Sequence, residues 1–328
     1  MKCINKRLAA LMAAILILSV CGCGTKEIPF AYDPNYEVSS FRISAESSAP
    51  IANAFASGLC VVVGDVNVDL STVDMTEATA AGLFDVNNNQ VVYAKNVHER
   101  LHPASLTKVL TALVALKYGN PEDRITVTDG AYVNESGAVV CGLKAGDQLT
   151  LNQALHALLM KSANDVANAI AIHISGSVEE FAELMNQEAQ ALGATNSHFV
   201  NPNGLTAEDH YSTAYDLYLL FNAAVKYELF SEIIHKTGYE MVYNAANGTQ
   251  KTISISTTNQ YLVEGSYKAP GQVSVIGGKT GTTEAARSCL ILLSKDASGN
   301  PFISVILSAK ERGILYESMT DLLEQIGS

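Results

Sequence analysis

Residues 103–108 read Pro103-Ala104-Ser105-Leu106-Thr107-Lys108, and they open a segment that reads as a helix from Leu106 to Tyr118. Proline suits the first turn of a helix, where its missing N–H would have no partner. Ser105 and Lys108 are three residues apart, so their side chains are neighbours on one helix face. The first turn also offers free N–H groups and the positive end of the helix dipole to a developing negative charge. This stretch therefore predicts a helix that begins at a candidate nucleophile.

A lysine can activate this serine only in its neutral form. A serine hydroxyl is a weak nucleophile until a base takes its proton. Burial, or a second cation nearby, would lower the pKa of Lys108 and leave its amine neutral. Lys279 could be that cation if the fold brings it close to Lys108. Ser105 and Lys108 are therefore a candidate pair of nucleophile and base.

Strands are predicted at both ends of the domain, with helices between them. Two β-forming stretches, at 81–86 and 90–95, flank Asn87-Asn88-Asn89, which is a hairpin signal. The other predicted strands span 273–280, 288–293 and 302–307, and the predicted helices span 106–118, 150–174 in two pieces, 177–192, 213–227 and 316–326. The simplest architecture is an α/β (α+β) fold in which one antiparallel sheet, formed from both chain ends, carries an inserted helical lobe. No second domain is expected after the last helix.

The composition fits a folded, acidic protein. The chain has 328 residues, of which 48% are hydrophobic and 16% charged, and its formal net charge is −12. A chain this apolar and this weakly charged is not disordered. The acidic balance argues against a nucleic-acid partner, which needs a basic face to displace counterions. No apolar run approaches the roughly 18 residues needed to span a bilayer.

The N-terminus has the pattern of a secretion signal. Three basic residues precede an apolar stretch at 8–20, which is too short to cross a membrane. Gly22-Cys23 resembles a bacterial lipobox, which implies cleavage before Cys23 and lipidation of its thiol; an ordinary cleaved signal peptide is the alternative. We thus predict a signal peptide over 1–22, a polar tether over 23–58 and the catalytic domain over 59–328. The expected location is extracytoplasmic, either anchored in the membrane by the lipid or secreted or periplasmic.

Three other catalytic patterns do not fit their surroundings. His98-Glu99-Arg100-Leu101-His102 has the spacing of a zinc-binding helix, but it lies in a polar strand-to-helix connection and Pro103 follows directly. Gly278-Lys279-Thr280 resembles the end of a phosphate-binding loop, but Val273 stands where that motif needs glycine. The chain has no Gly-x-Ser-x-Gly elbow of the α/β-hydrolases. We therefore expect neither a metal nor a cofactor.

Three short motifs occur together: Ser105-Leu106-Thr107-Lys108, Ser162-Ala163-Asn164 and Lys279-Thr280-Gly281. Any one of them occurs by chance, but the trio in this order is typical of penicillin-binding proteins and class A β-lactamases. The chain resembles the D-alanyl-D-alanine carboxypeptidases, which are low-molecular-mass penicillin-binding proteins and serine peptidases. The resemblance runs from about Ala80 to the C-terminus, and its further matching stretches span 143–147, 199–205, 210–217 and 278–283.

The resemblance implies a β-lactamase/transpeptidase-like fold and a catalytic role for the first two motifs. It implies that Ser105 attacks the D-Ala–D-Ala bond of a peptidoglycan stem peptide and forms an acyl-enzyme, with Lys108 as the base. Ser162 and Asn164, which lie at a predicted break between helices, would complete the proton path. β-Lactam antibiotics mimic the dipeptide, so they would acylate Ser105 and leave slowly.

The third motif is expected to bind the substrate. The charge of Lys279 and the hydroxyl of Thr280 suit a carboxylate, and Gly281 has no side chain to block an extended peptide that pairs with the strand edge. The resemblance implies that the backbone N–H groups of Ser105 and Thr282 form the oxyanion hole. It also implies a further basic residue late in the sheet that helps to hold the carboxylate, for which Lys310 and Arg312 are both candidates.

Other activities remain open at this point. A β-lactamase deacylates quickly with a glutamate in a Glu-x-x-Leu-Asn loop, and the closest stretch here, at 182–186, has Ala182 in the place of that glutamate. An endopeptidase for wall cross-links would use the same site with a wider mouth. A non-enzymatic, anchored wall-binding or penicillin-sensing protein would keep the fold alone.

The remaining polar candidates are read as structural. His210 is expected to be a satisfied structural histidine. Cys60, Cys141 and Cys289 have no metal-site spacing and are expected to be small buried residues. Cys141 lies close to the stretch at 143–147, which the family places near the active site.

Overall fold

The computed structural model describes residues 56–69 and 73–326 of the chain. The predicted signal peptide over 1–22, the lipidation of Cys23 and most of the tether over 23–58 therefore lie outside the described residues. Within the described part, no helix combines the length and the apolar character needed to cross a bilayer.

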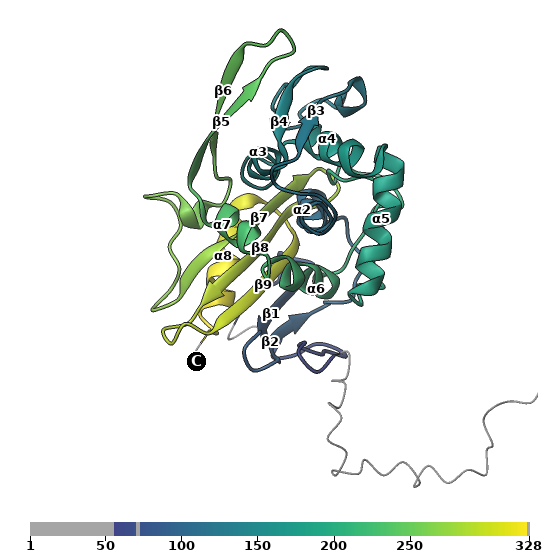
Figure 1. The fold of residues 1–328 in the computed structure, drawn as a ribbon. Helices are drawn as coiled ribbons and strands as arrows, with labels where there is room; N and C mark the ends of the chain where they lie inside the picture. The colour runs from purple at the N-terminus through teal and green to yellow at the C-terminus, as the bar shows by residue number, and fades with distance from the viewer. Residues whose placement is uncertain (1–55, 70–72, 327–328) are drawn as a thin grey trace, which may run out of the picture. The chain divides into compact units, whose positions relative to one another are not determined.

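Both ends of the domain contribute to one antiparallel sheet, as predicted from the sequence. Its strands lie in the order β2-β1-β9-β8-β7, so β7 forms one edge (Figure 1). The strands are β1 (Ala80–Asp85), β2 (Gln90–Lys95), β7 (Ser274–Thr283), β8 (Arg287–Lys295) and β9 (Pro301–Ala309). The pairing of β1 with β9 joins the two ends, with Ala80 opposite Leu307.

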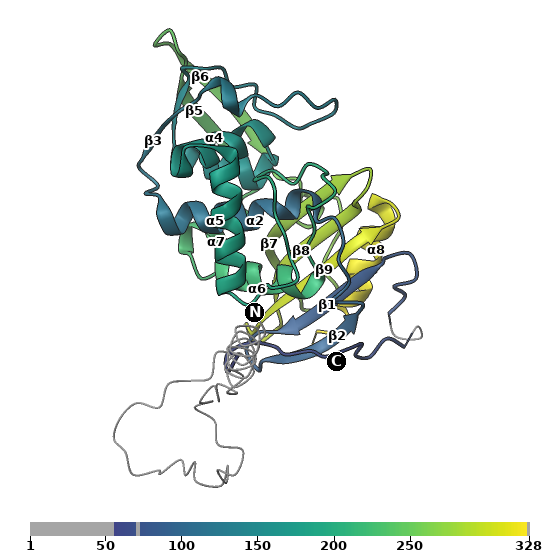
Figure 2. The same ribbon diagram turned by 90° about the vertical axis from the view of Figure 1, so that its right-hand side faces the viewer.

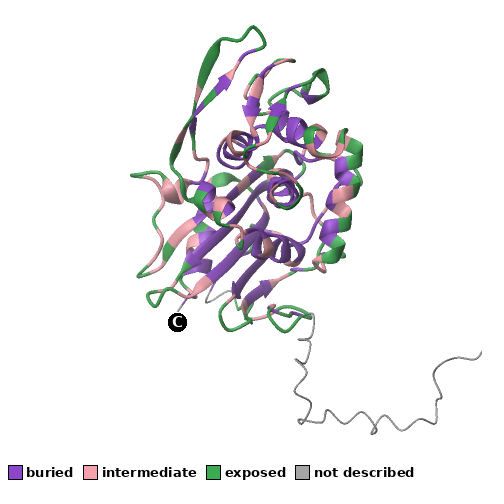
Figure 3. Ribbon diagram, in the orientation of Figure 1, coloured by how far each residue is buried: buried purple, intermediate pink, exposed green. Residues whose placement is uncertain are grey.

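Side chains alternate along a strand, so the two faces of this sheet pack into two separate hydrophobic cores. Leu290 and Leu292 face the closing helix α8 (Arg312–Leu323), whereas Ile291 and Leu293 face the helical lobe. The central strands are buried along most of their length (Figure 3). The sheet is therefore covered on both sides, with α8 on one face and the helical lobe on the other (Figure 2).

The helical lobe is built around one buried helix. Residues 107–115 of α2 (Thr107–Tyr118) are all buried, so this helix forms the centre of the lobe. Ser177 and Thr213 accept backbone N–H bonds at the starts of α5 and α6, which is the usual stabilisation of a helix N-terminus. The lobe's other helices are α3 (Leu151–His156), α4 (Asn164–Ser175), α5 (Val178–Ala191), α6 (Ala214–Ala224) and α7 (Glu228–His235).

The sequence prediction did not include a second, smaller sheet. Its strands lie in the order β3-β4-β5-β6. They are β3 (Arg124–Thr126), β4 (Gln148–Thr150), β5 (Gly238–Asn244) and β6 (Gln250–Ser256). Strands β3 and β4 have only three residues each, which is too short to show a pattern. In β6, Ile253 and Ile255 alternate with exposed polar residues, and the sequence analysis missed this signal. The short helix α7 was also missed, and α8 begins four residues before the predicted start at 316.

Gly204 approaches the start of α2 so closely that no side chain fits there. Its φ is +81°, and a Cβ atom would lie 2.0 Å from the carbonyl oxygen of Ala104. Gly137 has the same φ of +81° but open space around the same position. Substitution of these two glycines therefore distinguishes two losses of stability: that from a left-handed backbone alone, and that from a steric clash in addition.

We expect Gly137→Ala to lower the free energy of unfolding by about 1 kcal/mol, because only the left-handed conformation opposes the methyl group. Gly204→Ala should cost roughly 3 kcal/mol or more, since the backbone at Ala104 must also move. Urea unfolding of both variants measures the difference. Equal losses for the two variants would contradict the close approach.

Candidate active site

The candidate nucleophile lies in a tight turn that leads into the central helix. Ser105 is the middle residue of the 3₁₀ turn η2 (Ala104–Leu106), and α2 follows directly. Ala104 has a φ of +48°, which is a strained conformation for a residue with a side chain. Strand β7 passes this turn, since a Cβ on Gly281 would lie 3.1 Å from the Ser105 backbone nitrogen. The absence of a side chain at Gly281 thus lets β7 reach the nucleophile.

Lys108 is fully buried below Ser105. Its Nζ lies 3.0 Å from Ser105 Oγ and 2.7 Å from Asn164 Oδ1, and it also donates to the carbonyl oxygen of Asn203. Burial is the main cause that lowers the pKa of Lys108 well below its usual value, and the charge of Lys279 lowers it further. The surroundings of Lys108 therefore favour its neutral amine over the ammonium ion.

In its neutral form, Lys108 can make all three of these contacts. Such an amine has two hydrogens and one lone pair. The oxygens of Asn164 and Asn203 can only accept, so they use both hydrogens. The lone pair is then left for the hydroxyl hydrogen of Ser105, which is the arrangement that removes a proton from a serine.

Ser162 stands at an irregular break between two helices, as the sequence predicted. Helix α3 continues into the π-helical turn η4 (Ala157–Lys161), and Ser162 follows with a left-handed φ of +65°. Helix α4 then begins at Asn164. The break points the Asn164 carboxamide at Lys108 and gives the Ser162 hydroxyl a bond from Lys279 Nζ at 2.9 Å.

Lys279 is buried on the far side of Ser162. Its Nζ also donates to the carbonyl oxygen of Thr280 at 2.8 Å. Burial lowers the pKa of Lys279 to about 7. The structure thus brings together Ser105, Lys108, Ser162, Asn164 and Lys279, which come from segments up to 174 residues apart in the sequence.

Asp165 holds a loop against the site, and the sequence analysis did not single it out. Its carboxylate accepts the backbone N–H groups of Cys141, Gly142 and Leu143 at 2.9, 2.8 and 3.2 Å. The backbone N–H of Asn164 also donates to the carbonyl oxygen of Val139. The loop therefore forms a wall of the site, and an acidic residue directly after a Ser-x-Asn motif was the signal that could have revealed it.

Two cavities meet at Ser105 and Ser162. One has a volume of about 310 Å³ and includes Glu135, Asn164 and Glu284 in its lining. The other has a volume of about 220 Å³ and runs along Thr280 and Gly281 to Arg312. Val139 and Thr282 line both cavities. The nucleophile thus lies between an acidic half and a basic half of one cleft.

Arg312 and Lys310 differ sharply in position. Arg312 lines the smaller cavity and donates through Nη2 to the carbonyl oxygen of Thr258 at 3.2 Å. Lys310 forms an ion pair with Glu77 at 3.0 Å and lines neither cavity at Ser105. Of the two candidates for the further basic residue, Arg312 is the one beside the cleft.

The histidines considered in the sequence analysis form hydrogen bonds with backbone carbonyl oxygens or with a hydroxyl group. His98 and His102 hydrogen-bond the carbonyl oxygens of Val62 and His210, and they lie in the connection before η2 rather than on a helix. His210 is buried against the Thr107 hydroxyl, and burial lowers its pKa to about 4. In the described part of the chain, no three His, Cys, Asp or Glu side chains are grouped to hold a metal.

Of the three cysteines, Cys289 lines the smaller of the two cavities at Ser105, where it pairs with Gly281 across the sheet. Cys60 and Cys289 are buried free thiols, as expected, whereas Cys141 is only half-buried. Cys141 is absent from the lining of both cavities at Ser105. The stretch at 182–186 lies in α5, where the side chain of Asn186 hydrogen-bonds the backbone of Phe199, so it has a structural contact.

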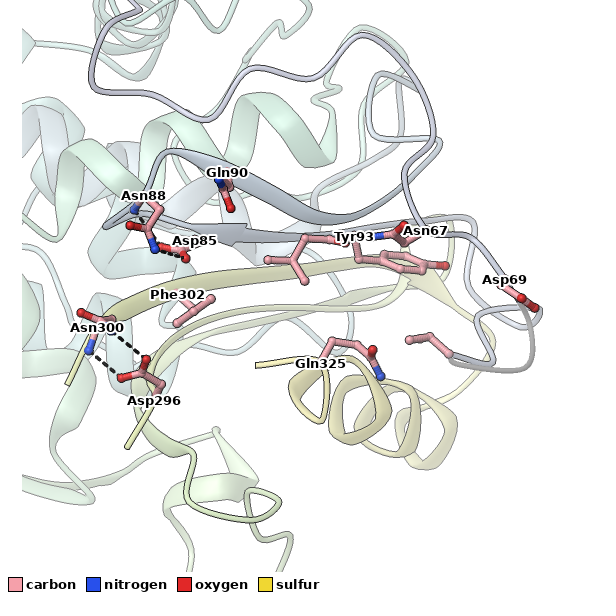
Figure 4. Close-up of a pocket in the computed structure, with 12 residues that line it drawn as sticks. Asn67, Asp69, Asp85, Asn88, Gln90, Tyr93, Asp296, Asn300, Phe302 and Gln325 are labelled. Atoms are coloured by element: carbon pink, nitrogen blue, oxygen red, sulfur yellow. Dashed lines mark hydrogen bonds between the residues drawn. The ribbon is translucent and has the colours of Figure 1, made fainter. Parts of the chain in front are cut away.

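A larger hollow of about 550 Å³ lies elsewhere on the sheet, near the β1–β2 and β8–β9 turns (Figure 4). Its two turn carboxylates are already engaged: Asp85 binds the backbone and side chain of Asn88, and Asp296 does the same for Asn300. These contacts stabilise the two hairpin turns, and none of the residues around Ser105 lines this hollow.

The sheet, the helical lobe and the cluster around Ser105 have the arrangement of a β-lactamase/transpeptidase-like fold. A family model described as D-alanyl-D-alanine carboxypeptidase matches residues 67–311, which is most of the chain. The chain therefore belongs to the D-alanyl-D-alanine carboxypeptidase family. The expectation from the sequence motifs is confirmed at the level of fold and family.

Individual proteins similar to this chain include carboxypeptidases and an endopeptidase. The D-alanyl-D-alanine carboxypeptidase DacF of Bacillus subtilis is 35% identical over 252 residues, which cover 75% of this chain and 61% of that protein. A D-alanyl-D-alanine endopeptidase of Escherichia coli is 27% identical over 277 residues and covers 84% of each chain. A solved D-alanyl-D-alanine carboxypeptidase from Mycobacterium tuberculosis superposes with a TM-score of 0.69 at 26% identity, over 80% of this chain and 95% of that one. The match thus spans about three fifths of the Bacillus protein.

The buried lysines predict how stability depends on pH. The pKa of Lys279 is about 7 in the folded protein but about 10.4 in an unfolded chain. Between these values the unfolded chain binds more protons, so the free energy of unfolding rises as pH increases from about 7 to about 10. The contribution is on the order of a few kcal/mol. It is fully present above pH 10 and lost below about pH 7.

Urea unfolding at several pH values, for the natural protein and Lys279→Met, measures this contribution. The difference between the two free energies of unfolding should move in favour of the natural protein as pH rises. Lys310→Met is the matched control, because that lysine is exposed. Parallel curves for the natural protein and Lys279→Met would contradict the lowered pKa.

Proposed function

We propose that this protein is a serine-type D-Ala-D-Ala carboxypeptidase. It removes the terminal D-alanine from peptidoglycan stem pentapeptides through an acyl-enzyme on Ser105. The observation that carries the proposal is the contact of Ser105 Oγ with Lys108 Nζ at 3.0 Å, at a buried amine that also donates to Asn164 and Asn203. Family membership supports the choice of reaction and substrate.

The proposed reaction begins when Ser105 attacks the carbonyl carbon between the two D-alanines and passes its proton to Lys108. The oxyanion that develops is stabilised by the backbone N–H groups of Ser105 and Thr282, at the helix start where negative charge is favoured. Ser162, bonded to Lys279, then relays a proton to the leaving amine. Water releases the shortened peptide from Ser105.

The smaller cavity suits the departing D-alanine. Its volume of about 220 Å³ is small, and Arg312 and Thr280 offer a guanidinium group and a hydroxyl to a carboxylate. Lys279 adds positive charge behind the strand. We assign the substrate carboxylate to this end of the cleft, and the acyl chain of the stem peptide to the cavity of about 310 Å³.

A β-lactam should acylate Ser105, because it presents a strained amide and a carboxylate in the arrangement of the dipeptide. Intact mass after penicillin treatment of a soluble fragment that starts at Thr25 should show one persistent adduct. The same treatment of Ser105→Ala should show none, while circular dichroism reports that the variant is folded. No adduct and no loss of penicillin in the folded natural protein would overturn the proposal in favour of a wall-binding protein.

An endopeptidase is the second candidate, because the Escherichia coli endopeptidase matches this chain over 84% of both lengths. Both reactions use the same acyl-enzyme and differ in the leaving group, which is free D-alanine in one case and a cross-linked stem in the other. Product analysis with a pentapeptide and with a cross-linked dimer distinguishes them. Release of D-alanine from the pentapeptide, with the dimer left intact, supports the carboxypeptidase.

We further propose that the mature chain begins at a lipidated Cys23 and acts outside the cytoplasm, anchored in the membrane. The support is the basic and apolar N-terminal pattern followed by Gly22-Cys23. Such an anchor would keep the domain close to its wall substrate. The peptide substrate, β-lactams and the membrane lipid are then its partners.

Metabolic labelling with a fatty acid tests the anchor. The natural protein and Cys21→Ala should take up the label and partition with membranes, because Cys21 is expected to be removed with the signal peptide. Cys23→Ala should do neither. Equal labelling of all three proteins, or none, would contradict lipidation at Cys23.

A further inference from the structure

The proposed carboxylate-binding groups come from two different elements of the fold. Thr280 lies on the edge strand β7, whereas Arg312 is the first residue of α8. Arg312 is exposed, and a long exposed side chain has several rotamers of similar energy. A carboxylate spans only a few ångströms, so both groups can hold it only if something fixes their separation.

The segment between β6 and β7 is well placed to do this. We call residues 257–262 the brace. Its C-terminal part is η5 (Gln260–Leu262), which is attached to α8: the Gln260 N–H donates to the Tyr316 hydroxyl at 3.0 Å. The Tyr261 hydroxyl lies 2.7 Å from Thr320 Oγ1 and donates to the carbonyl oxygen of Tyr316 at 3.1 Å.

Thr258 is the residue of the brace that contacts both proposed groups. Its Oγ1 lies 2.7 Å from Thr280 Oγ1, and its carbonyl oxygen accepts a bond from Arg312 Nη2 at 3.2 Å. It is half-buried and also lines the cavity of about 220 Å³. Among the residues that the structure describes, Thr258 is the one whose side chain hydrogen-bonds the Thr280 hydroxyl.

We propose that Thr258 is a positioning residue, which sets the orientation of the Thr280 hydroxyl and the place of Arg312 for the substrate carboxylate. The inference rests on the proposed function, because it needs a carboxylate at this end of the cleft. A hydroxyl rotates freely unless a partner fixes it. When Thr258 donates to Thr280 Oγ1, the hydrogen of Thr280 stays available for the carboxylate.

The two bonds of Thr258 act together. The carbonyl oxygen limits where the guanidinium group of Arg312 can lie, and the hydroxyl limits the rotation of Thr280. Both groups are thereby ordered before the substrate arrives, so less conformational entropy is lost on binding. The effect of Thr258 should fall on affinity for the carboxylate and leave the reaction at Ser105 and Lys108 unchanged.

Thr258→Val tests the hydroxyl, since valine keeps the shape of threonine and removes one polar atom. The measurement is calorimetric binding in the Ser105→Ala background, which reports affinity without turnover. The probes are an N-acetylated tripeptide ending in D-Ala-D-Ala and the same tripeptide with an amide in place of its terminal carboxylate. Loss of one hydrogen bond should weaken binding of the acid roughly three- to tenfold and leave binding of the amide within twofold.

Two matched variants separate positioning from a general structural effect. Thr258→Ser keeps the hydroxyl and should restore the affinity for the acid to within twofold. Thr257→Val removes the neighbouring hydroxyl, which accepts the Asn259 N–H at 3.2 Å and contacts neither Thr280 nor Arg312, so it should also stay within twofold. Thermal unfolding of each variant reports whether the fold is intact.

Several results would overturn the inference: an unchanged affinity of Thr258→Val for the acid, equal losses for acid and amide, or the same loss in Thr257→Val. Failure of the acid peptide to bind the Ser105→Ala protein would overturn it as well. The proposed function is read separately, from hydrolysis of the acid peptide by protein with Ser105 intact. In that protein, Thr258→Val should raise KM and leave kcat within twofold.

Discussion

The site depends on the hydrogen bonds of the buried Lys108 amine. This amine joins the central helix to the start of α4 through Asn164 and to the loop before α6 through the Asn203 carbonyl oxygen. A lysine in such a place is costly while charged and much less costly once neutral. The same burial that places Lys108 in the core also favours its neutral form, so the packing and the proposed chemistry have one cause.

A second buried lysine behind Ser162 extends this arrangement. Lys279 donates to Ser162, which stands two residues before Asn164, and Lys108 contacts both Asn164 and Ser105. Two ammonium groups in a low-dielectric region repel each other, so a charge on one favours the neutral form of the other. Strand β7 supplies Lys279 and α2 supplies Lys108, so this coupling exists only after the sheet and the helical lobe have assembled.

Much of the fold was predictable because its signals are local. The β1–β2 hairpin has its turn residues between two apolar runs. Pro103 precedes η2, and α2 then runs through a continuous apolar segment. The small sheet was not predictable in the same way. Its strand β5 pairs with β4 only at Asn244 opposite Gln148, nearly a hundred residues away, and such a contact leaves no periodic pattern in either segment.

The site was predictable to the extent that motifs determine it. The three short motifs identified the side chains that meet at Ser105, and the break at Ser162 was visible as an interruption of helical periodicity. The Asn203 carbonyl oxygen was not predictable, because any residue has a backbone carbonyl and only the fold selects this one. The choice between Lys310 and Arg312 also needed the structure, since α8 begins between them and directs only Arg312 to the cleft.

The π-helical turn over Ala157–Lys161 sets the rotational phase of the chain that follows it. An α-helix turns by about 100° with each residue, so the residue count before a side chain determines the direction in which it points. A π turn holds more residues than an α turn, and here it ends at the left-handed Ser162 before α4 starts afresh. A chain one residue shorter within this turn would keep all three motifs and nearly the same composition. Its Ser162 would lie about 100° away around the helix axis, so the chain would leave the helix in another direction and α4 would no longer begin with Asn164 at Lys108. The length of the segment between two motifs is thus as much a part of the site as the motifs themselves.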